Sequence, residues 1–333
     1  MKNFNARTLA IAASFLFFAS SLVSCKKESV SDLAASAGQT PTSTTKPATI
    51  PSGTDTANTG NPVGTDGNTG GSNIGETANL TLATATTTTT PTTPVYNRTI
   101  NWNNRSNGSY NLSLASTDFT SPSYWNAYNA QTTSGMLKAT LKANTVGPTG
   151  GAMSNFNVPD AGTYQLNYSI MFGTDFDFSY GGKVGFGCMI GNGYTGGVPG
   201  WNGLGGSARI MWYKENGRVY LKPYAYYKDQ PGTYGNDFGK TYPATGSIAK
   251  GVWYNVKMLV KANTGSNTNG RLQIIINGTT LIDQPMRWTT NDAYRLVKNI
   301  CFENFRGGSD AYWGSPTNGS IYFDNVSMTA YSS

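Results

Sequence analysis

The most informative absence in this chain is histidine, which does not occur among its 333 residues. Without imidazole, Ser–His–Asp and Cys–His catalytic sites are excluded, as is any zinc site that needs a histidine ligand. Charged residues are also scarce, at 12% of the chain. No stretch repeats apolar residues at helical spacing over three turns, and the Glu- and Lys-rich heptads of coiled coils are missing.

Glycine and aromatic residues are abundant instead, with 40 Gly, 20 Tyr, 14 Phe and 7 Trp. Aromatic side chains fit pleated, half-buried strand surfaces, and glycine supplies the backbone conformations of tight turns. The composition therefore predicts an all-β protein. At roughly 150 residues per domain the length allows two domains, so the composition along the chain must decide how much of it folds.

The first 24 residues have the layout of a secretory signal peptide. Lys2 and Arg7 precede an apolar stretch, residues 9–23, that is too short and too interrupted by Ser and Ala to indicate a membrane span. The sequence Leu22-Val23-Ser24-Cys25 then resembles the bacterial lipobox, in which the cysteine is lipidated and becomes the mature N-terminus. That resemblance implies an exported lipoprotein, held through Cys25 at the outer membrane or cell surface.

Residues 25–95 are rich in Thr, Ser, Gly, Pro, Asn and Ala. Such a segment buries too little apolar surface to offset its ordering entropy, so we expect a disordered tether between the lipid and a single domain, residues 96–333. That domain holds 19 basic and 12 acidic residues and thus the whole net charge of +7. A basic exported domain favours an anionic partner: an acidic polysaccharide, extracellular nucleic acid or the envelope surface. The alternative is that this net charge serves only to keep the domain soluble.

Within residues 96–333 apolar and polar residues alternate with the period of two that is typical of strands. Strands are predicted at residues 164–170, 254–260, 272–276, 279–282, 297–305 and 320–328. Asn277-Gly278, between two of them, is a strong signal for a two-residue hairpin turn. This pattern predicts one β-sandwich or β-jelly roll of two antiparallel sheets.

Two cysteines remain after Cys25. Cys188 and Cys301 would be able to form a disulfide in an exported domain, although sequence spacing alone does not decide it. Cys188 alternates in register with Phe186 and Ile190, which favours a buried thiol instead.

Three neighbouring strands are predicted to present basic and tyrosine side chains from one sheet face. The alternation places the following residues on that face: Lys183, Gly185 and Gly187; Ser207 and Arg209; and Tyr220, Lys222, Tyr224, Tyr226 and Lys228. A strand face that pairs a lysine with two glycines indicates close approach by a ligand or another chain. A solvated face with amphipathic tyrosines is the alternative interpretation.

Four segments that include these strands resemble the alginate and glucuronan lyases of polysaccharide lyase family 14. They read FDFSYGGKVG, GGSARIMW, YAYYKDQPGTYG and FENFRGGSDAYWGSPTNGSIYFDNV, in that order, and span most of the domain. The resemblance implies a β-jelly roll with five catalytic residues, Lys183, Ser207, Arg209, Tyr224 and Tyr226. The spacing from Arg209 to the tyrosines is a few residues longer than the family pattern, which makes Tyr220 a rival for the first tyrosine.

The resemblance implies endo-acting cleavage of an acidic uronan by β-elimination. A base removes the C5 proton next to the carboxylate, and an acid protonates the leaving 4-oxygen. The planar guanidinium of Arg209 suits the carboxylate, whereas Lys183 is either the base or a second cation on that carboxylate; a tyrosine is the other candidate base. Tyr220, Lys222 and Lys228 are the expected substrate-binding residues.

No cofactor and no catalytic metal are expected, and the anticipated partner is an anionic polysaccharide rather than nucleic acid, bound by a monomer. Asp175 and Asp177 are the nearest carboxylate pair, but they do not establish a glycosidase pattern. Residues 305–310 and 322–325 are considered only as places for a structural cation. A non-catalytic carbohydrate-binding jelly roll is the principal alternative, because a basic and aromatic face would also hold a sugar chain.

Overall fold

The computed structural model describes residues 93–123 and 125–332. The predicted signal peptide, the lipidation site Cys25 and nearly all of the predicted tether lie outside these residues. The first strand begins at Pro94, next to the boundary expected after residue 95. No helix in the described ranges is both long and apolar enough to cross a membrane.

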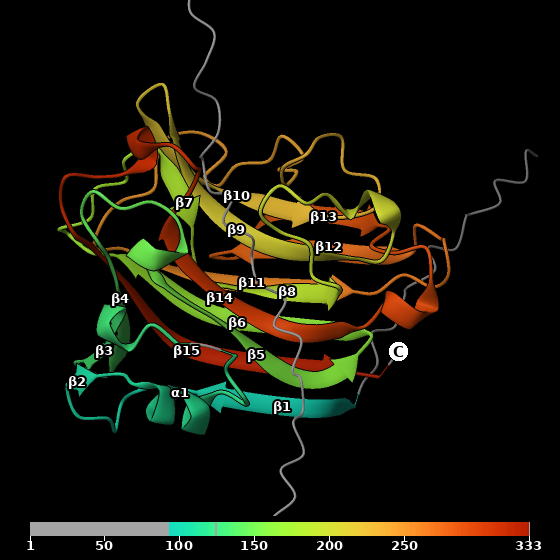
Figure 1. Cartoon of the computed structure of the whole chain (residues 1–333), viewed down its shortest axis with the longest axis horizontal. Helices are drawn as coiled ribbons and strands as arrows, with labels where there is room; N and C mark the ends of the chain where they lie inside the picture. Colours follow the sequence, from blue (N-terminus) through green and yellow to red (C-terminus); the bar gives the residue numbers. More distant parts are fainter. Residues whose placement is uncertain (1–92, 124, 333) are drawn as a thin grey trace, which may run out of the picture. The chain divides into compact units, whose positions relative to one another are not determined.

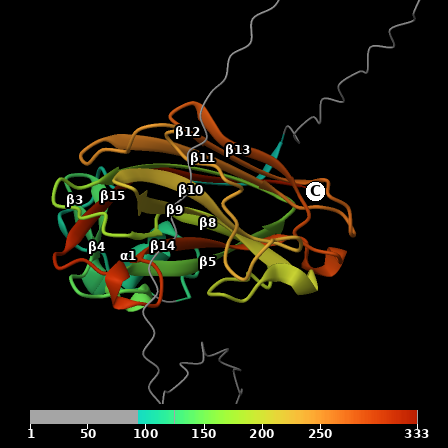
Figure 2. The same ribbon diagram turned by 90° about the horizontal axis from the view of Figure 1, so that it is seen from above.

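Two antiparallel sheets pack face to face, as the two layers in Figures 1 and 2 show. The nine-stranded sheet has the order β13 (Thr279–Met286), β12 (Gly270–Ile276), β11 (Trp253–Lys261), β6 (Thr163–Phe172), β15 (Gly319–Tyr331), β4 (Met136–Leu141), β3 (Ala130–Thr133) and β2 (Gly108–Ser109), with β1 (Pro94–Ile100) paired to β15. The six-stranded sheet has the order β10 (Arg218–Tyr226), β9 (Gly205–Glu215), β7 (Gly181–Lys183), β14 (Val297–Arg306) and β5 (Ala152–Ala161), with β8 (Phe186–Gly191) between β14 and β9. The predicted β-sandwich is confirmed.

The core lies between the sheets and consists of the apolar residues that alternate along each strand. Leu166 and Ile170 of β6 face Ile210 and Trp212 of β9 in one continuous apolar cluster. Burial of such side chains is the main stabilising contribution, about 25 cal/mol for each Å² of apolar surface removed from water. The predicted hairpin is present: Asn277 and Gly278 both have positive φ, 47° and 78°, as a two-residue turn requires.

One short helix was not anticipated. Helix α1 (Leu112–Asp118) has only two turns, too few for its period to stand out, although Asn111 at its N-cap accepts a hydrogen bond from the Leu114 amide. Five 3₁₀ turns complete the described elements: η1 (Ala127–Asn129), η2 (Pro148–Gly150), η3 (Gly200–Asn202), η4 (Asp292–Tyr294) and η5 (Ala311–Trp313).

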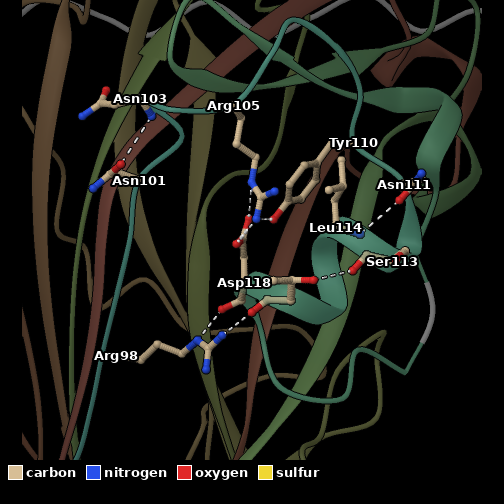
Figure 3. A network of polar contacts seen from close by, with 10 residues as sticks. Arg98, Asn101, Asn103, Arg105, Tyr110, Asn111, Ser113, Leu114 and Asp118 are labelled. Carbon is tan, nitrogen blue, oxygen red and sulfur yellow. Dashed lines mark hydrogen bonds and ion pairs between the residues drawn. The ribbon is translucent and has the colours of Figure 1, made fainter.

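Asp118, at the end of α1, joins the segments that precede the main sandwich strands (Figure 3). Its carboxylate accepts hydrogen bonds from Arg105, with which it forms an ion pair, and from the Tyr110 hydroxyl at 2.5 Å. Arg98 of β1 donates to the carbonyls of Thr117 and Asp118, which have no partner within the helix because they lie at its end. These bonds fix α1 against β1.

Cys188 and Cys301 are both buried and unpaired. In the register of β8 and β14, Cys188 lies opposite Ile300, whereas Cys301 lies opposite Gly187. Because side chains alternate between faces along a strand, the two thiols point to opposite sides of the sheet, and the possible disulfide is not formed.

Candidate active site

The outer face of the six-stranded sheet, turned away from the core, carries rows of aligned side chains. The register of β10 and β9 pairs Tyr226 with Ser207, Tyr224 with Arg209, Lys222 with Met211, and Tyr220 with Tyr213. Strand β7 continues one row, because Lys183 lies beside Met211 on one side and Phe305 on the other. Consecutive rows are two residues apart, about 7 Å along the strand. The predicted grouping of Lys183, Arg209 and the tyrosines is therefore present.

Arg209 lies beneath this face rather than on it. Its side chain is 5% exposed, and its Nη1 donates to Glu303 Oε2 of β14 at 2.8 Å. The guanidinium carbon lies 5.3 Å from the centroid of the Tyr224 ring and 5.4 Å from that of Tyr226. Among the described residues, no hydrogen-bond partner reaches the buried Nε and Nη2 of Arg209. A buried ion pair with two unsatisfied donors is unfavourable for stability alone, which favours a functional role.

Gly187 makes room for Arg209. A Cβ at this position would lie 2.3 Å from the Ala208 carbonyl oxygen and 2.9 Å from Arg209 Cγ. Only a residue without a side chain lets the arginine pass across β8 toward Glu303. The close approach inferred from the lysine–glycine strand is therefore made at Gly187 by the protein's own arginine.

Gly185 departs from the predicted strand. The sequence places it on the same face as Lys183, but β7 ends at Lys183 and β8 begins at Phe186. Gly185 has a φ of +89°, and a Cβ there would meet the Tyr168 ring on the core side. A break between the two strands, not one continuous strand, positions Lys183.

Lys183 is a basic group whose surroundings strongly lower its pKa. Its Nζ lies 4.8 Å from the centroid of the Tyr224 ring and 5.4 Å from that of Phe305. Within the described ranges it forms no salt bridge. Burial and, to a smaller extent, the positive charge of Arg209 together lower the pKa of Lys183 to about 8, while Glu303 opposes the shift. A fraction of this lysine is therefore a neutral amine, able to accept a proton, near neutral pH.

Tyr224 and Tyr226 cover Arg209 and complete the cluster. Their ring centroids are 5.7 Å apart, and burial raises the pKa of Tyr224, so its hydroxyl keeps its proton. The Tyr226 hydroxyl accepts a hydrogen bond of 3.0 Å from the Gly197 amide, in the loop between β8 and β9. Since Tyr224, and not Tyr220, lies opposite Arg209, the geometry favours Tyr224 as the first tyrosine of the pair.

Ser207 is completely buried at the end of the same face. Its hydroxyl donates to the Tyr194 carbonyl at 2.7 Å, which ties β9 to the loop that also binds Tyr226. A buried hydroxyl engaged in this way positions the loop and does not present itself to a ligand.

Of the three expected substrate-binding residues, one lies in the row of Lys183, one is buried and one lies outside the strand. Lys222 lies in the row of Lys183, and its Nζ is 3.1 Å from Asp237 Oδ2 and 4.1 Å from the Tyr213 ring centroid. Tyr220 is 6% exposed, and its hydroxyl donates to Glu215 at 3.0 Å. Lys228 lies beyond the end of β10, so the alternation that would place it on the outer face does not extend to it.

Glu303 is the site residue that sequence reasoning missed. It shares the outer face of β14 with Cys301 and Phe305, and its carboxylate is 8% exposed. The available signal was that Glu303 is the one acidic residue of β14, but only the fold shows that Arg209 is its partner.

No group of three or more Cys, Asp and Glu side chains in residues 93–123 and 125–332 lies close enough together to hold a metal ion. Of the acidic residues in the two segments considered for a cation, Asp310 accepts a bond from the Ser309 hydroxyl and Asp324 from the Asn325 amide. Both bonds join residues that are adjacent in the sequence.

Comparisons with known proteins found a matching family and similar solved structures. Residues 129–326 match the family described as Polysaccharide lyase 14. A solved mutant of the alginate lyase Aly36B in complex with alginate tetrasaccharide is 50% identical, with a TM-score of 0.70; the match covers 71% of this chain and 97% of that one.

Two more distant proteins were also found. The marine PL-14 alginate lyase from Aplysia kurodai is 21% identical with a TM-score of 0.56, covers 72% of this chain and 100% of its own, and shares the fold. Exolysin of Paramecium bursaria Chlorella virus 1 is 27% identical over an alignment of 204 residues, and the match covers 51% of this chain. The match spans only 30% of the length of that viral protein.

Proposed function

The chain belongs to polysaccharide lyase family 14, and on this premise we propose that it cleaves an acidic uronan, alginate-like or glucuronan-like, by β-elimination. The observation that carries the proposal is the half-buried, partly neutral Lys183 beside the Arg209–Glu303 ion pair. The likeness to an alginate lyase crystallised with an alginate tetrasaccharide supports alginate as the first substrate to test.

In the proposed reaction the neutral amine of Lys183 takes the C5 proton of the uronate. The electron pair left on carbon forms the C4=C5 double bond while the C4–O bond to the neighbouring sugar breaks. The Tyr226 hydroxyl is buried beneath the loop that contains Gly197, so this loop has to move for the hydroxyl to give its proton to the leaving oxygen. The hydroxyl then recovers a proton from the Lys183 ammonium through solvent. General acid–base catalysis of this kind contributes about 10²–10⁴-fold.

Arg209 contributes mainly through its charge. Direct bidentate pairing with the substrate carboxylate, which the sequence favoured, would require the covering side chains to move, because the guanidinium is 5% exposed. From its buried position the charge stabilises the enolate-like intermediate and keeps part of Lys183 neutral. Glu303 holds Arg209 in place, and Ser207 positions the neighbouring loop.

The decisive experiment is an assay of the purified protein on alginate, polymannuronate and glucuronan. The new double bond is conjugated with the carboxylate, so we expect ultraviolet absorbance to rise with at least one polymer. Affinity without any rise would indicate a binding module instead. No interaction with any of the three would contradict both functions.

Internal cleavage of the polymer is part of the proposal, because aligned rows of side chains continue on both sides of Lys183, to Tyr226 and to Tyr220. An endo-acting enzyme lowers the viscosity of alginate long before most bonds are broken. Early release of only short products, with the viscosity unchanged, would contradict it.

We also propose that Cys25 anchors the protein to the membrane at the outer membrane or cell surface. The Cys25→Ala variant is expected to leave the membrane fraction and to keep its activity. Deletion of residues 26–93, which ends before β1, should leave activity and thermal stability unchanged. If this deletion unfolded the domain, the proposed domain boundary would be wrong.

A further inference from the structure

Four aromatic side chains gather at the end of the outer face beyond Lys183. This aromatic platform consists of Tyr180, Tyr213, Tyr312 and Trp313. The ring of Tyr180 lies 5.1 Å from those of Tyr312 and Trp313 and 5.8 Å from that of Tyr213, measured between centroids. Tyr180 is 44% exposed and Tyr312 59% exposed. Large aromatic surfaces that cluster in contact with water typically mark a binding site.

The platform continues the row pattern of the catalytic residues. Tyr213 lies opposite Gly181, two residues before Lys183 on β7, so the platform begins about 7 Å from the lysine row. Gly181 has no side chain that would separate the platform from the row of Lys183. In Figure 1 the turn η5, which carries Tyr312 and Trp313, lies beside β7.

Trp313 is held firmly in this place. A Cβ on Gly308, whose φ is +114°, would lie 2.1 Å from Trp313 Nε1, so only glycine fits under the indole. The Trp313 carbonyl accepts a hydrogen bond of 2.9 Å from the Ser179 hydroxyl, in the residue before Tyr180. The fold thus fixes the exposed rings instead of burying them.

An ion pair accompanies the rings. Lys222 Nζ lies 4.1 Å from the Tyr213 ring centroid, and Asp237 holds it there at 3.1 Å. Flat rings next to an ammonium group match a sugar ring that has an apolar C–H face and a carboxylate.

We propose that the aromatic platform is a subsite that binds a uronate ring of the same polysaccharide chain, beyond the sugar attacked at Lys183. The inference rests on the proposed function, because it takes the uronan as ligand. The apolar face of the sugar stacks on Tyr312. The Tyr180 ring, turned 76° from that of Tyr312, borders the edge of the sugar, and the sugar carboxylate displaces Asp237 from Lys222.

The test separates binding from catalysis by using the Lys183→Ala background, in which the polymer is not consumed. The affinity for polymannuronate is measured by calorimetry with and without the added changes Tyr180→Ala and Tyr312→Ala. We expect the added changes to weaken binding about tenfold, as loss of aromatic contact residues does. Tyr128→Ala is the matched control, since Tyr128 is 69% exposed but lies on η1, outside the platform.

In the otherwise native protein the same two changes should raise KM about tenfold and leave kcat nearly unchanged. Equal affinity and equal KM in the platform and control variants would overturn the subsite while leaving the lyase activity established. Absence of any lyase activity in the native protein would overturn the proposed function, and the calorimetric comparison would still decide whether the platform binds the polymer.

Discussion

Two clusters in this molecule each combine an arginine, a carboxylate and at least one tyrosine, but they differ in how many of their hydrogen-bonding groups have a partner. In the cluster around Asp118, the carboxylate binds Arg105 and the Tyr110 hydroxyl (Figure 3). In the cluster around Arg209, the partner Glu303 occupies one nitrogen, and the more deeply buried guanidinium keeps two donors without a partner in the described part of the chain. Satisfied buried polar groups stabilise a fold, whereas incomplete ones near a perturbed lysine indicate chemistry.

The largest expected effect is on activity, at the incomplete cluster. Lys183→Ala removes the proposed base, and we expect kcat to fall by about 10⁴-fold, the upper range for such a group. Thermal stability should not decrease, because the change removes a half-buried cation that has no ion-pair partner within the described residues. Lys257→Ala, an exposed lysine on the nine-stranded sheet, is the control and should leave both quantities unchanged. Near-full activity of the Lys183 variant would show that these strands are not the active site.

Tyr226→Phe should have the next largest effect. The change keeps the ring over Arg209 and removes only the hydroxyl, so kcat is expected to fall by about 10²–10³-fold. The melting temperature should fall modestly, because the Gly197 amide loses its acceptor. Steady-state kinetics and a thermal melt measure both. Unchanged kcat with the fold intact would assign the acid role to another group.

Glu303→Gln tests whether the ion pair holds the incomplete cluster together. It leaves Arg209 buried without a counter-charge, which costs about 3–5 kcal/mol of stability. The negative charge of Glu303 raises the pKa of Lys183, so its loss should lower that pKa further and move the acid limb of kcat/KM to lower pH. A movement of that limb to higher pH would contradict the assignment.

Where the Gln variant is too unstable to assay, Arg209→Met with Glu303→Gln replaces the whole pair and should fold. Because Arg209 lowers the pKa of Lys183 more than Glu303 raises it, this double variant should move the acid limb to higher pH.

The smallest effect is expected at the complete cluster, and on stability alone. Asp118→Asn should lower the free energy of unfolding by about 2–3 kcal/mol, because Arg105 and Tyr110 lose a charged acceptor. Assayed below the melting temperature, kcat/KM should not change. Asp283→Asn is the matched control, since its ion pair with Arg271 is about 40% exposed and contributes little. Loss of activity in the folded Asp118 variant would remove the distinction between the two clusters.

Alternation along the chain was sufficient to predict the sandwich and the shared face of Lys183, Arg209 and Tyr224, since a period of two fixes which side each residue takes. It was not sufficient to predict the depth of Arg209 or its bond to Glu303. Those depend on the absent side chain of Gly187 and on the order of strands that lie far apart in the sequence. The hydroxyl bond of Ser207 depends in the same way on the path of a loop.

The most direct test of the central claim, that Lys183 is a base and not simply a cation, is the Lys183→Arg variant assayed on alginate across pH. Arginine keeps the positive charge but stays protonated. The native protein should show kcat/KM rising with pH through an apparent pKa of about 8, where the lysine loses its proton, and Lys183→Arg should show no measurable rise in ultraviolet absorbance at any pH. Substantial activity of the arginine variant would contradict the claim and leave Lys183 as a charge on the substrate carboxylate.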